Sequence, residues 1–313
     1  MKVLVTGITG FVGSAVAKAM RAKGWQVVGQ AHQSNESDFP TTKLSITSQT
    51  DWSSLLSGVD LVIHCAALAP RKGQKISFDN YLETNTKGTV ALAQQSVAYG
   101  VKRLIFISSV KVNGETSSND RPFTRDSLVA PEDDYGISKY EAERALLELN
   151  HSSDLQVTIV RSPLVYGPGV TSNFSAMLAL VNKQVPLPFG AVRNRRSLVF
   201  IGNLVDLIDT LATHPNVAGK IFFVSDDHDV STTELFERIG AAMDLKVTLL
   251  PIPNWLLIGL CLLFRRQNIS NKLLRSLKVD ISSTKADLEW SPPVSFEQGI
   301  AITVRDYLDR TTR

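Results

Sequence analysis

The first two-thirds of the chain alternate short, β-branched apolar runs with stretches of helical periodicity. The apolar runs predict five strands, at Lys2–Thr6, Gln26–Gly29, Leu61–His64, Leu104–Ile107 and Val157–Val160. The stretches between them predict helices at Val12–Ala22, Thr84–Ala98 and Ser138–Asn150. Strands that alternate with helices are typical of a parallel, doubly wound sheet, and continuous apolar strands suit a sheet buried on both faces. The pattern therefore predicts an α/β fold.

Beyond about residue 165 the periodicity weakens. Glycine and proline break the chain into short pieces, at Gly167, Pro168, Gly169, Pro186, Pro188 and Gly190. We expect a first domain at 1–166, completed by parts of 196–224, and a smaller C-terminal domain in most of 167–313. Ligands of open α/β sheets bind outside the carboxyl ends of the strands, where later segments can cover them. The second domain is therefore expected to bind substrate.

Composition removes several classes of protein. The 313 residues are 43% hydrophobic and 20% charged, which is ordinary globular composition, and the net charge of +3 with no basic block disfavours nucleic-acid binding. Cys65 and Cys261 lie far apart in the chain, so neither a disulfide framework nor a metal site is expected. This cysteine usage fits a protein of the reducing cytoplasm. No signal peptide is readable, and the longest apolar run, Trp255–Phe264, is about half of the ~20 residues that a spanning helix needs.

A glycine-rich turn follows the first predicted strand. Thr6–Gly13 places glycines at positions 7, 10 and 13 and leads into the first predicted helix. Without side chains, the backbone N–H groups can approach a pyrophosphate at the positive end of the helix. Glycine turns also close ordinary strand–helix corners, but this position is the one that a dinucleotide site requires. The first domain is therefore expected to bind a dinucleotide.

The spacing between a tyrosine and a lysine suits proton transfer. Tyr135 and Lys139 are four residues apart, so they lie on one face if the helix at Ser138–Asn150 begins near Tyr135. A nearby ammonium favours the phenolate and would lower the pKa of Tyr135 toward working pH. The alternative is a solvated helical pair. Ser108–Ser109, after the Leu104–Ile107 strand, favours the catalytic interpretation because its hydroxyl could bond the same substrate oxygen.

Together these motifs resemble the extended short-chain dehydrogenase/reductases of the NAD-dependent epimerase/dehydratase family, which act mainly on nucleotide sugars. The resemblance implies a Rossmann-like sheet with a smaller substrate-binding domain. It covers nearly the whole chain and rests on Thr6–Gly13, His64–Ala67, Asn85–Thr89, Ser109, Tyr135–Lys139, Arg161–Gly169, Arg196–Asp206 and the stretch Asp280–Ile300 with Leu288–Pro292.

The resemblance implies roles for individual residues. Tyr135 would be the acid/base, Lys139 would lower its pKa and hold the nicotinamide ribose, and Ser109 would orient the sugar hydroxyl. Asn173 and Arg196 would hold the substrate diphosphate, although an arginine among Arg193, Arg195 and Arg196 can equally be a solvated charge. Asn85 would support the architecture of the site. The implied cofactor-binding residues are Gly7, Thr9, Gly10, Phe11, Val12, Gly13, His32, Ser45, Ile46, Cys65, Ala66, Ala67, Asn85, Tyr135, Lys139, Ser162 and Pro163, and no metal is implied.

Two departures from the family pattern narrow the chemistry. Val110–Lys111 stands where 4,6-dehydratases carry an adjacent acid pair, so dehydration is not expected. The second strand continues as Gly29–Ser34 without the acid that normally binds the adenosine ribose, and Ser45 replaces the aspartate that contacts adenine in many epimerases. The choice between NAD and NADP therefore stays open.

The expected reaction is hydride transfer at C4 of a UDP-hexose or UDP-N-acetylhexosamine. A UDP-glucose or UDP-N-acetylglucosamine 4-epimerase is slightly favoured over an NADPH-dependent reductase of a UDP-4-keto-6-deoxy sugar. The stretches Ser109–Gly114 and Asn194–Val199 look most like bacterial O-antigen and capsule members, which implies surface polysaccharide biosynthesis. A non-catalytic dinucleotide sensor would typically lack the tyrosine–lysine pair. A dehydrogenase of steroid-like or flavonoid-like substrates would have no reason for a phosphate-binding Arg196.

Two further surfaces are expected to make contacts. Family members of this type usually form homodimers through the helices that correspond to Thr84–Ala98 and Ser138–Asn150, and the second carries apolar residues at Ala142, Ala145, Leu146 and Leu149. The run Trp255–Phe264 is apolar on every face of a helix, which predicts burial within the chain. The alternative is contact with a partner or a membrane surface, helped by Arg265 and Arg266.

Overall fold

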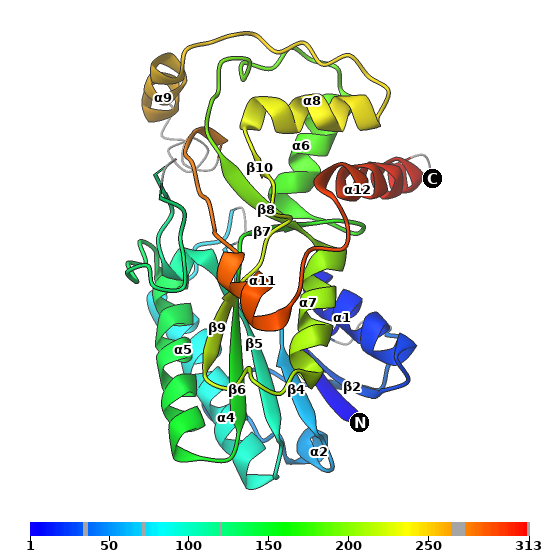
Figure 1. Cartoon of the computed structure of the whole chain (residues 1–313), viewed down its shortest axis with the longest axis vertical. Coiled ribbons are helices and arrows are strands. Elements are labelled where there is room, and N and C mark those ends of the chain that lie inside the picture. Colours follow the sequence, from blue (N-terminus) through cyan, green and yellow to red (C-terminus); the bar gives the residue numbers. More distant parts are fainter. Residues whose placement is uncertain (34–36, 71–72, 119–120, 264–272, 312–313) are drawn as a thin grey trace.

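The computed structural model describes residues 1–33, 37–70, 73–118, 121–263 and 273–311 (Figure 1). Its larger sheet has seven parallel strands in the order β3-β2-β1-β4-β5-β6-β9. These strands are β1 (Lys2–Thr6), β2 (Gln26–Ala31), β3 (Thr41–Lys43), β4 (Leu61–His64), β5 (Arg103–Ser109), β6 (Gln156–Ser162) and β9 (Lys220–Phe223). The predicted doubly wound parallel sheet is confirmed, and all five predicted strands belong to it.

Helices cover both faces of this sheet because side chains alternate along each strand. Val3 and Val5 of β1 join one apolar core, whereas Leu4 joins the other. The first core is closed by α1 (Phe11–Ala22) and α7 (Ile201–Thr213), and the second by α2 (Ser53–Leu56), α4 (Gly88–Ala98) and α5 (Asp134–Ser152). Figure 1 shows α4 and α5 on one side of the sheet and α1 and α7 on the other.

The helix predicted at Thr84–Ala98 is divided. A short helix α3 (Phe78–Tyr81) passes into a π-helical turn η1 (Leu82–Lys87) before α4 begins. Helical periodicity alone does not distinguish a π turn from an α turn, and such turns are frequent at functional sites. The turn buries the Asn85 side chain, which is 2% exposed.

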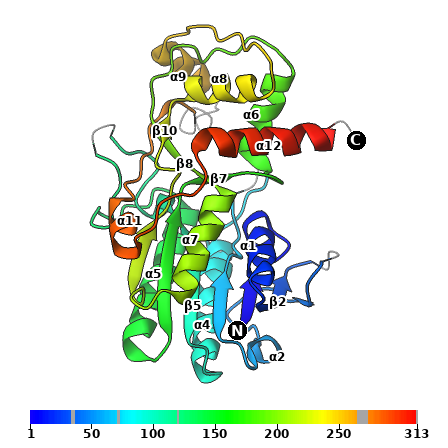
Figure 2. The same ribbon diagram turned by 45° about the vertical axis from the view of Figure 1, so that its right-hand side comes forward.

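The second unit lies beyond the carboxyl ends of the parallel strands, as Figures 1 and 2 show. A three-stranded sheet in the order β10-β8-β7 carries helices around it. Its elements are β7 (Leu164–Tyr166), α6 (Ser172–Asn182), β8 (Arg196–Phe200), β10 (Asp229–Val230), α8 (Thr232–Ala242), α9 (Asn254–Leu263) and α12 (Phe296–Thr311). The helix α11 (Ser282–Leu288) instead packs against β9 of the large sheet. The chain returns to the large sheet between β8 and β10, through α7 and β9. The domain boundary at residue 166 stays a prediction.

Hydrogen bonds of polar side chains hold the C-terminal stretch against α7. The Trp290 indole donates to Asp206 at 2.7 Å, and the Asn203 amide exchanges hydrogen bonds of 2.8 and 2.9 Å with the backbone of Val294. The Asp226 carboxylate accepts from Asn203 at 2.7 Å and from the Tyr166 hydroxyl at 2.7 Å. These bonds join two motifs of the family resemblance, Arg196–Asp206 and Asp280–Ile300.

The apolar run at 255–264 does not pack as expected. Leu257 is buried against Val192 and Leu274. The remaining large side chains described on α9 are exposed: Trp255 by 72%, Leu256 by 39%, Ile258 by 40% and Leu262 by 53%. The expected burial is therefore wrong for these four residues, because α9 rests on the second unit through one stripe only. Phe264, Arg265 and Arg266 lie outside the described residues. No helix in the described part of the chain is long and apolar enough to cross a membrane.

Candidate active site

The glycine turn after β1 forms an open cradle. Gly7 has a φ of +65°, which a residue with a side chain rarely adopts, and a methyl group on Gly13 would lie 2.2 Å from the Gly7 carbonyl oxygen. Gly10 precedes α1 and supplies no side-chain cap to the first N–H groups of the helix. Thr9 and Gly10 are exposed, and Phe11 and Val12 are half-buried. Glycines and free N–H groups in this arrangement fit a dinucleotide pyrophosphate.

The end of β2 supports this turn through Gln30, which sequence reasoning treated only as the absence of an acid. Its Oε1 accepts from the Gly7 N–H at 3.0 Å, and its Nε2 donates to the Leu44 carbonyl at 2.5 Å. Ala31 is fully buried, so His32 is the first exposed side chain after the strand. The exposed Ser45 hydroxyl lies 3.5 Å from His32 Nδ1. Gln30 thus supports the glycine turn, and among the described residues 29–33 no carboxylate extends from the end of β2.

Tyr135 and Lys139 lie on α5, which packs on β5, the strand that ends at Ser109. The Asp133 carboxylate caps α5 by accepting from the Gly136 N–H at 2.7 Å, so both Tyr135 and Lys139 lie inside the helix. Lys139 Nζ donates to the Ile107 carbonyl at 2.9 Å and lies 4.4 Å from the centre of the Phe106 ring. Ser109 ends β5 two residues further on. The helix expected to begin near Tyr135 begins at Asp134.

Burial dominates the acidity of this pair. It lowers the pKa of the Lys139 ammonium to about 8, against the opposing effect of Glu143. Burial also raises the pKa of the Tyr135 hydroxyl, and Asp133 and Tyr81 raise it further. Lys139 is not among the causes of this shift, and its effect on the pKa of Tyr135 stays a prediction. The Lys139 ammonium donates to the Ile107 carbonyl, and the carboxylate of Asp133 acts on Tyr135.

A buried chain of hydrogen bonds connects the cofactor side of the site to α5. The Thr6 hydroxyl lies 2.6 Å from His64 Nδ1, and His64 Nε2 lies 2.9 Å from the Thr89 hydroxyl. Thr89 donates to the Asn85 carbonyl at 2.7 Å, and the Asn85 amide donates to the Ser138 hydroxyl at 3.0 Å.

The donor order in this chain determines the form of His64. Because Thr89 donates onward to Asn85, it accepts from a protonated Nε2 of His64, and the Thr6 hydroxyl then donates to Nδ1. Burial lowers the pKa of His64 to about 3, so the ring is neutral. Sequence reasoning identified Asn85 but missed Thr6, Thr89 and Ser138, whose connection arises only when β1, β4, η1, α4 and α5 pack together.

The other predicted cofactor residues lie around the same strand ends. Cys65, Ala66 and Ala67 follow β4 and are half-buried, and burial raises the pKa of the Cys65 thiol to about 12. Ile46 is buried against the start of α4, where a methyl group on Gly88 would lie 2.6 Å from Ile46 Cγ2. Ser162 and Pro163 are buried at the end of β6.

Lys111 stands where dehydratases carry an acid, and carboxylates hold it in place. Its ammonium contacts Asp133, the cap of α5, and lies 2.6 Å from Glu115. This position offers neither the acid nor the base that elimination of water needs. Among the described residues, no cluster of three or more His, Cys, Asp or Glu side chains is arranged to hold a metal ion.

The predicted diphosphate residues lie in the second unit. Arg196 begins β8 and donates to the Arg275 carbonyl at 2.9 Å. Burial lowers the pKa of its guanidinium to about 10, and Glu115 opposes this shift. Asn173 is exposed in the first turn of α6. Arg196 is half-buried, and its role toward a diphosphate stays a prediction.

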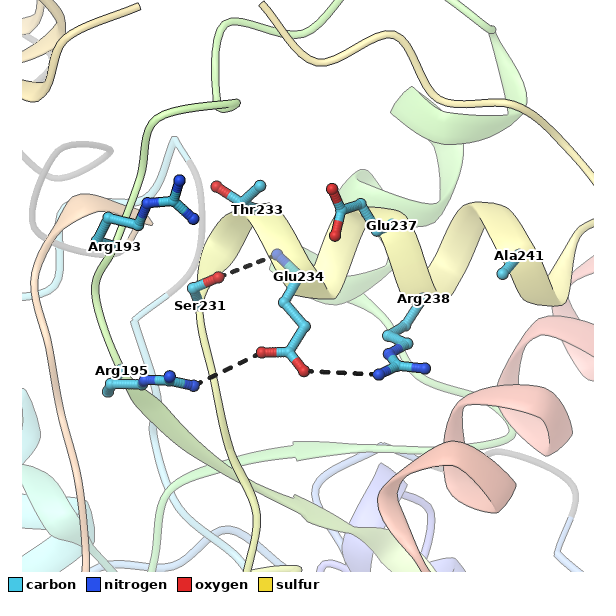
Figure 3. A pocket seen from close by; sticks show the side chains of 8 residues that line it. All are labelled: Arg193, Arg195, Ser231, Thr233, Glu234, Glu237, Arg238 and Ala241. Atoms are coloured by element: carbon cyan, nitrogen blue, oxygen red, sulfur yellow. Dashed lines mark hydrogen bonds and ion pairs between the residues drawn. The ribbon is translucent and has the colours of Figure 1, made fainter. Parts of the chain in front are cut away.

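The neighbouring arginines face elsewhere. Arg193 and Arg195 line a separate pocket of about 540 Å³ beside α8, together with Ser231, Thr233, Glu234, Glu237, Arg238 and Ala241. Figure 3 shows Glu234 between Arg195 and Arg238, at 3.7 and 3.9 Å. None of the predicted catalytic residues lines this pocket. Arg193 and Arg195 are exposed, and Arg195 also donates to the Asp229 carbonyl at 3.1 Å.

Comparisons with known proteins agree with this geometry. The NAD dependent epimerase/dehydratase family matches residues 3–224. The chain belongs to this family. It is 43% identical to a UDP-glucose 4-epimerase of Vibrio cholerae, over 99% of this chain and 97% of the relative. It is 25% identical, over 83% of this chain and 78% of the relative, to an N-acetyl-alpha-D-glucosaminyl-diphospho-ditrans,octacis-undecaprenol 4-epimerase of Escherichia coli O157:H7. Among solved structures, MoeE5 in complex with UDP-glucose and NAD superposes with a TM-score of 0.82 at 22% identity, with both chains fully covered.

These matches confirm four predictions. The family, the Rossmann-like fold, the enzyme class and a nicotinamide dinucleotide cofactor are as the sequence predicted, and NAD is the cofactor in the family's description. The chain is an NAD-dependent enzyme of the extended short-chain dehydrogenase/reductase type. The roles of individual site residues stay predictions.

Proposed function

We propose that this enzyme is a UDP-sugar 4-epimerase that acts on UDP-glucose or UDP-N-acetylglucosamine and serves surface polysaccharide biosynthesis. The observation that carries the proposal is the full-length match to the Vibrio cholerae enzyme. The packing of α5 on β5 supports it, because β5 ends at Ser109 and α5 carries Tyr135 and Lys139 in its first two turns. Arg196 would bind the diphosphate of the nucleotide, since a guanidinium matches phosphate geometry.

The residues present fit NAD on structural grounds. The glycine cradle has no room for a methyl group on Gly13, and the first N–H groups of α1 lack a side-chain cap. Gly7, Gly10 and Gly13 would hold the pyrophosphate, and Lys139 would hold the nicotinamide ribose. Bound NAD supplies the acceptor and the donor of hydride for C4.

The protein contributes the proton transfer and the positioning. Tyr135 takes the proton of the C4 hydroxyl as C4 is oxidised, and returns it to the same oxygen when C4 is reduced from the other face. Ser109 donates a hydrogen bond to that oxygen and keeps it near Tyr135. No water leaves the sugar in this reaction, which agrees with the side chains of Val110 and Lys111 after Ser109.

The second candidate is the NADPH-dependent reductase of a UDP-4-keto-6-deoxy sugar. One observation favours it: Gln30 is bonded to the glycine turn and Ala31 is buried, so among the described residues 29–33 no carboxylate is offered to the adenosine ribose. A reductase exchanges its cofactor after every turnover, and a loose adenosine site suits that exchange. On the same ground we expect the purified protein to carry substoichiometric cofactor.

The deciding experiment incubates the purified enzyme separately with UDP-glucose, UDP-N-acetylglucosamine and a UDP-4-keto-6-deoxy sugar, and follows C4 by NMR and nicotinamide by absorbance. We expect inversion at C4 of a UDP-hexose or UDP-N-acetylhexosamine without net consumption of cofactor. Inversion without added cofactor excludes the reductase. Consumption of NADPH only with the ketosugar excludes the epimerase.

We also propose a cytoplasmic homodimer that contacts a membrane surface through α9. The exposed Trp255, Ile258 and Leu262 support the membrane contact, since interfacial helices carry such residues. The Escherichia coli relative is named for an undecaprenol-linked substrate, which suits an enzyme at a membrane. On α5, Ala142 and Leu146 are buried in the chain's own core, so a partner chain would have to use the half-buried Ala145 and Leu149.

Sedimentation with and without anionic vesicles tests both contacts. We expect a dimer at micromolar concentration and co-sedimentation with vesicles at low salt. The Trp255→Ser variant should lose the vesicles and keep the dimer, because Trp255 lies on α9, far along the chain from α5. A single 34.3 kDa species would contradict the dimer, and wild-type protein left in the supernatant would contradict the membrane contact.

A further inference from the structure

Tyr135, Lys139 and Glu143 form one stripe along α5, because residues four apart lie above one another on a helix. Lys139 and Glu143 form hydrogen bonds with two successive residues of β5. Lys139 Nζ donates to the Ile107 carbonyl at 2.9 Å, and the Ser108 hydroxyl donates to Glu143 Oε1 at 2.5 Å. The next residue of the strand is Ser109. Two turns of the catalytic helix thus fix the strand immediately before the substrate hydroxyl-binding residue.

Glu143 is itself held by a buried arginine from the neighbouring strand β6. Arg161 Nη2 lies 2.5 Å from Glu143 Oε2, and Arg161 Nε donates to both carboxylate oxygens at 3.1 and 3.2 Å. Each side chain is 2% exposed. Arg161 Nη1 donates to Asn113 Oδ1 at 3.1 Å, and its guanidinium lies 5.9 Å from the Phe223 ring. Every described polar neighbour of the pair belongs to the segment that carries Ser109 or to the helix that carries Tyr135.

The stability of the fold does not explain this pair. Removing two charges from water is costly, and apolar side chains of similar volume commonly stabilise a core equally well. A charged pair at this position also affects nearby acid–base groups. The positive and the negative side chain shift the pKa of a group one or two helical turns away in opposite directions, since little water screens them.

We propose that Glu143, held by Arg161, is a positioning residue that aligns Ser109 with Tyr135 and balances the charge around the proton exchange of Tyr135 and Lys139. The proposal rests on the catalytic roles proposed above. It goes beyond them in assigning a function to residues that contact neither the sugar nor the nicotinamide.

The other titratable groups around Lys139 and Tyr135 are neutral or already paired. Lys139 faces Cys65 and His64 at the end of β4, and both are neutral because burial moves the pKa of the thiol to about 12 and that of the imidazole to about 3. Tyr135 faces Tyr81 of α3 and the carboxylate of Asp133, which is paired with Lys111. Glu143 is therefore the carboxylate of α5 that acts on the Lys139 ammonium.

The two halves of the ion pair predict opposite changes. In Glu143→Gln the Arg161 guanidinium is no longer neutralised, which disfavours the Lys139 ammonium and favours the Tyr135 phenolate, so both pKa values fall. In Arg161→Gln the Glu143 carboxylate is no longer neutralised, so both pKa values rise. We expect the profile of kcat/KM against pH to move by about half a unit or more, downward for Glu143→Gln and upward for Arg161→Gln. In the variant that carries both Glu143→Gln and Arg161→Gln, the pH profile should lie close to that of the wild type, but kcat should be lower.

Three matched variants separate charge from packing. Glu141→Gln removes a carboxylate of the same helix that pairs with Arg144 at the surface, so it should leave the profile unchanged. Ser108→Ala removes only the link between β5 and Glu143, and should lower kcat about tenfold without moving the profile. Arg161→Lys keeps the positive charge and should also leave the profile in place, so it supports the charge argument if Arg161→Gln does not fold.

A second readout needs no sugar. The affinity for NADH, followed by nicotinamide fluorescence, should fall as pH rises through about 8, because Lys139 loses its proton there. Its midpoint should move in the same opposite directions in the two Gln variants, which keeps this test separate from a failure of the epimerase assay. Folded Gln variants whose midpoints do not move, or move in the same direction, would overturn the proposal.

Discussion

Tyr135→Phe is expected to lower kcat by about 10²- to 10⁴-fold, the contribution typical of a general acid/base. The phenylalanine ring keeps the edge contact with Tyr81, whose ring centre lies 6.2 Å away. The hydroxyl accounts for the whole chemical difference, and the cap of α5 is made by Asp133. The fold and the binding of the cofactor should therefore survive.

The measurement compares turnover of the UDP-sugar with NADH binding by fluorescence. Tyr140→Phe is the matched control, because Tyr140 lies on the same helix below the guanidinium of Arg144 and outside the site. We expect Tyr140→Phe to retain wild-type turnover. Near-normal turnover in Tyr135→Phe would remove the catalytic assignment.

Lys139→Met is expected to lose turnover and cofactor affinity and yet to gain stability. The folded protein holds the pKa of Lys139 at about 8, below its ordinary 10.5, because burial disfavours the ammonium. Below pH 8 the lysine is charged in both the folded and the unfolded protein, so the full cost of burying the charge is present. Between pH 8 and 10.5 the folded protein sheds the proton first, and the cost disappears.

The free energy of unfolding should therefore show a characteristic dependence on pH. Lys139→Met should exceed wild type by on the order of a few kcal/mol at pH 7, and the difference should shrink toward pH 10.5. Methionine has a similar length and packs well near an aromatic ring, here that of Phe106. Urea unfolding at both pH values measures the effect, with the exposed Lys102→Met as control. A variant less stable than wild type at pH 7 would show that the Ile107 and Phe106 contacts outweigh the cost of burial.

In this site, sequence spacing places the two proposed catalytic residues, whereas tertiary packing sets their pKa values. Tyr135 and Lys139 are placed relative to each other by the helix alone, but their acidity depends on residues distant in the chain. Asp133 and Tyr81 act on the tyrosine, and Glu143 acts on the lysine under the control of Arg161. A spacing motif therefore predicts which groups exchange the proton and leaves their pKa values undetermined.

Several features were determined by local sequence. The apolar runs identified five strands of the parallel sheet, since a strand buried on both faces needs continuous apolar residues whatever its neighbours are. Gly7 and Gly13 indicated the turn after β1, because only glycine tolerates its backbone angle and its close contact. The family resemblance extended this to the enzyme class and the cofactor, which the comparisons confirm.

Other features were decided only by the tertiary structure. The strands β3, β7, β8, β9 and β10 are short or lie in segments without periodicity, and partners distant in sequence stabilise them. The exposure of α9 depends on how little of the second unit lies against it, which an all-apolar run does not reveal. Buried polar groups need partners, and the partners of His64, Gln30 and Glu143 come from other elements of the fold. Their roles follow from that pairing, because a buried hydrogen bond or charge is defined by what surrounds it and not by its place in the chain.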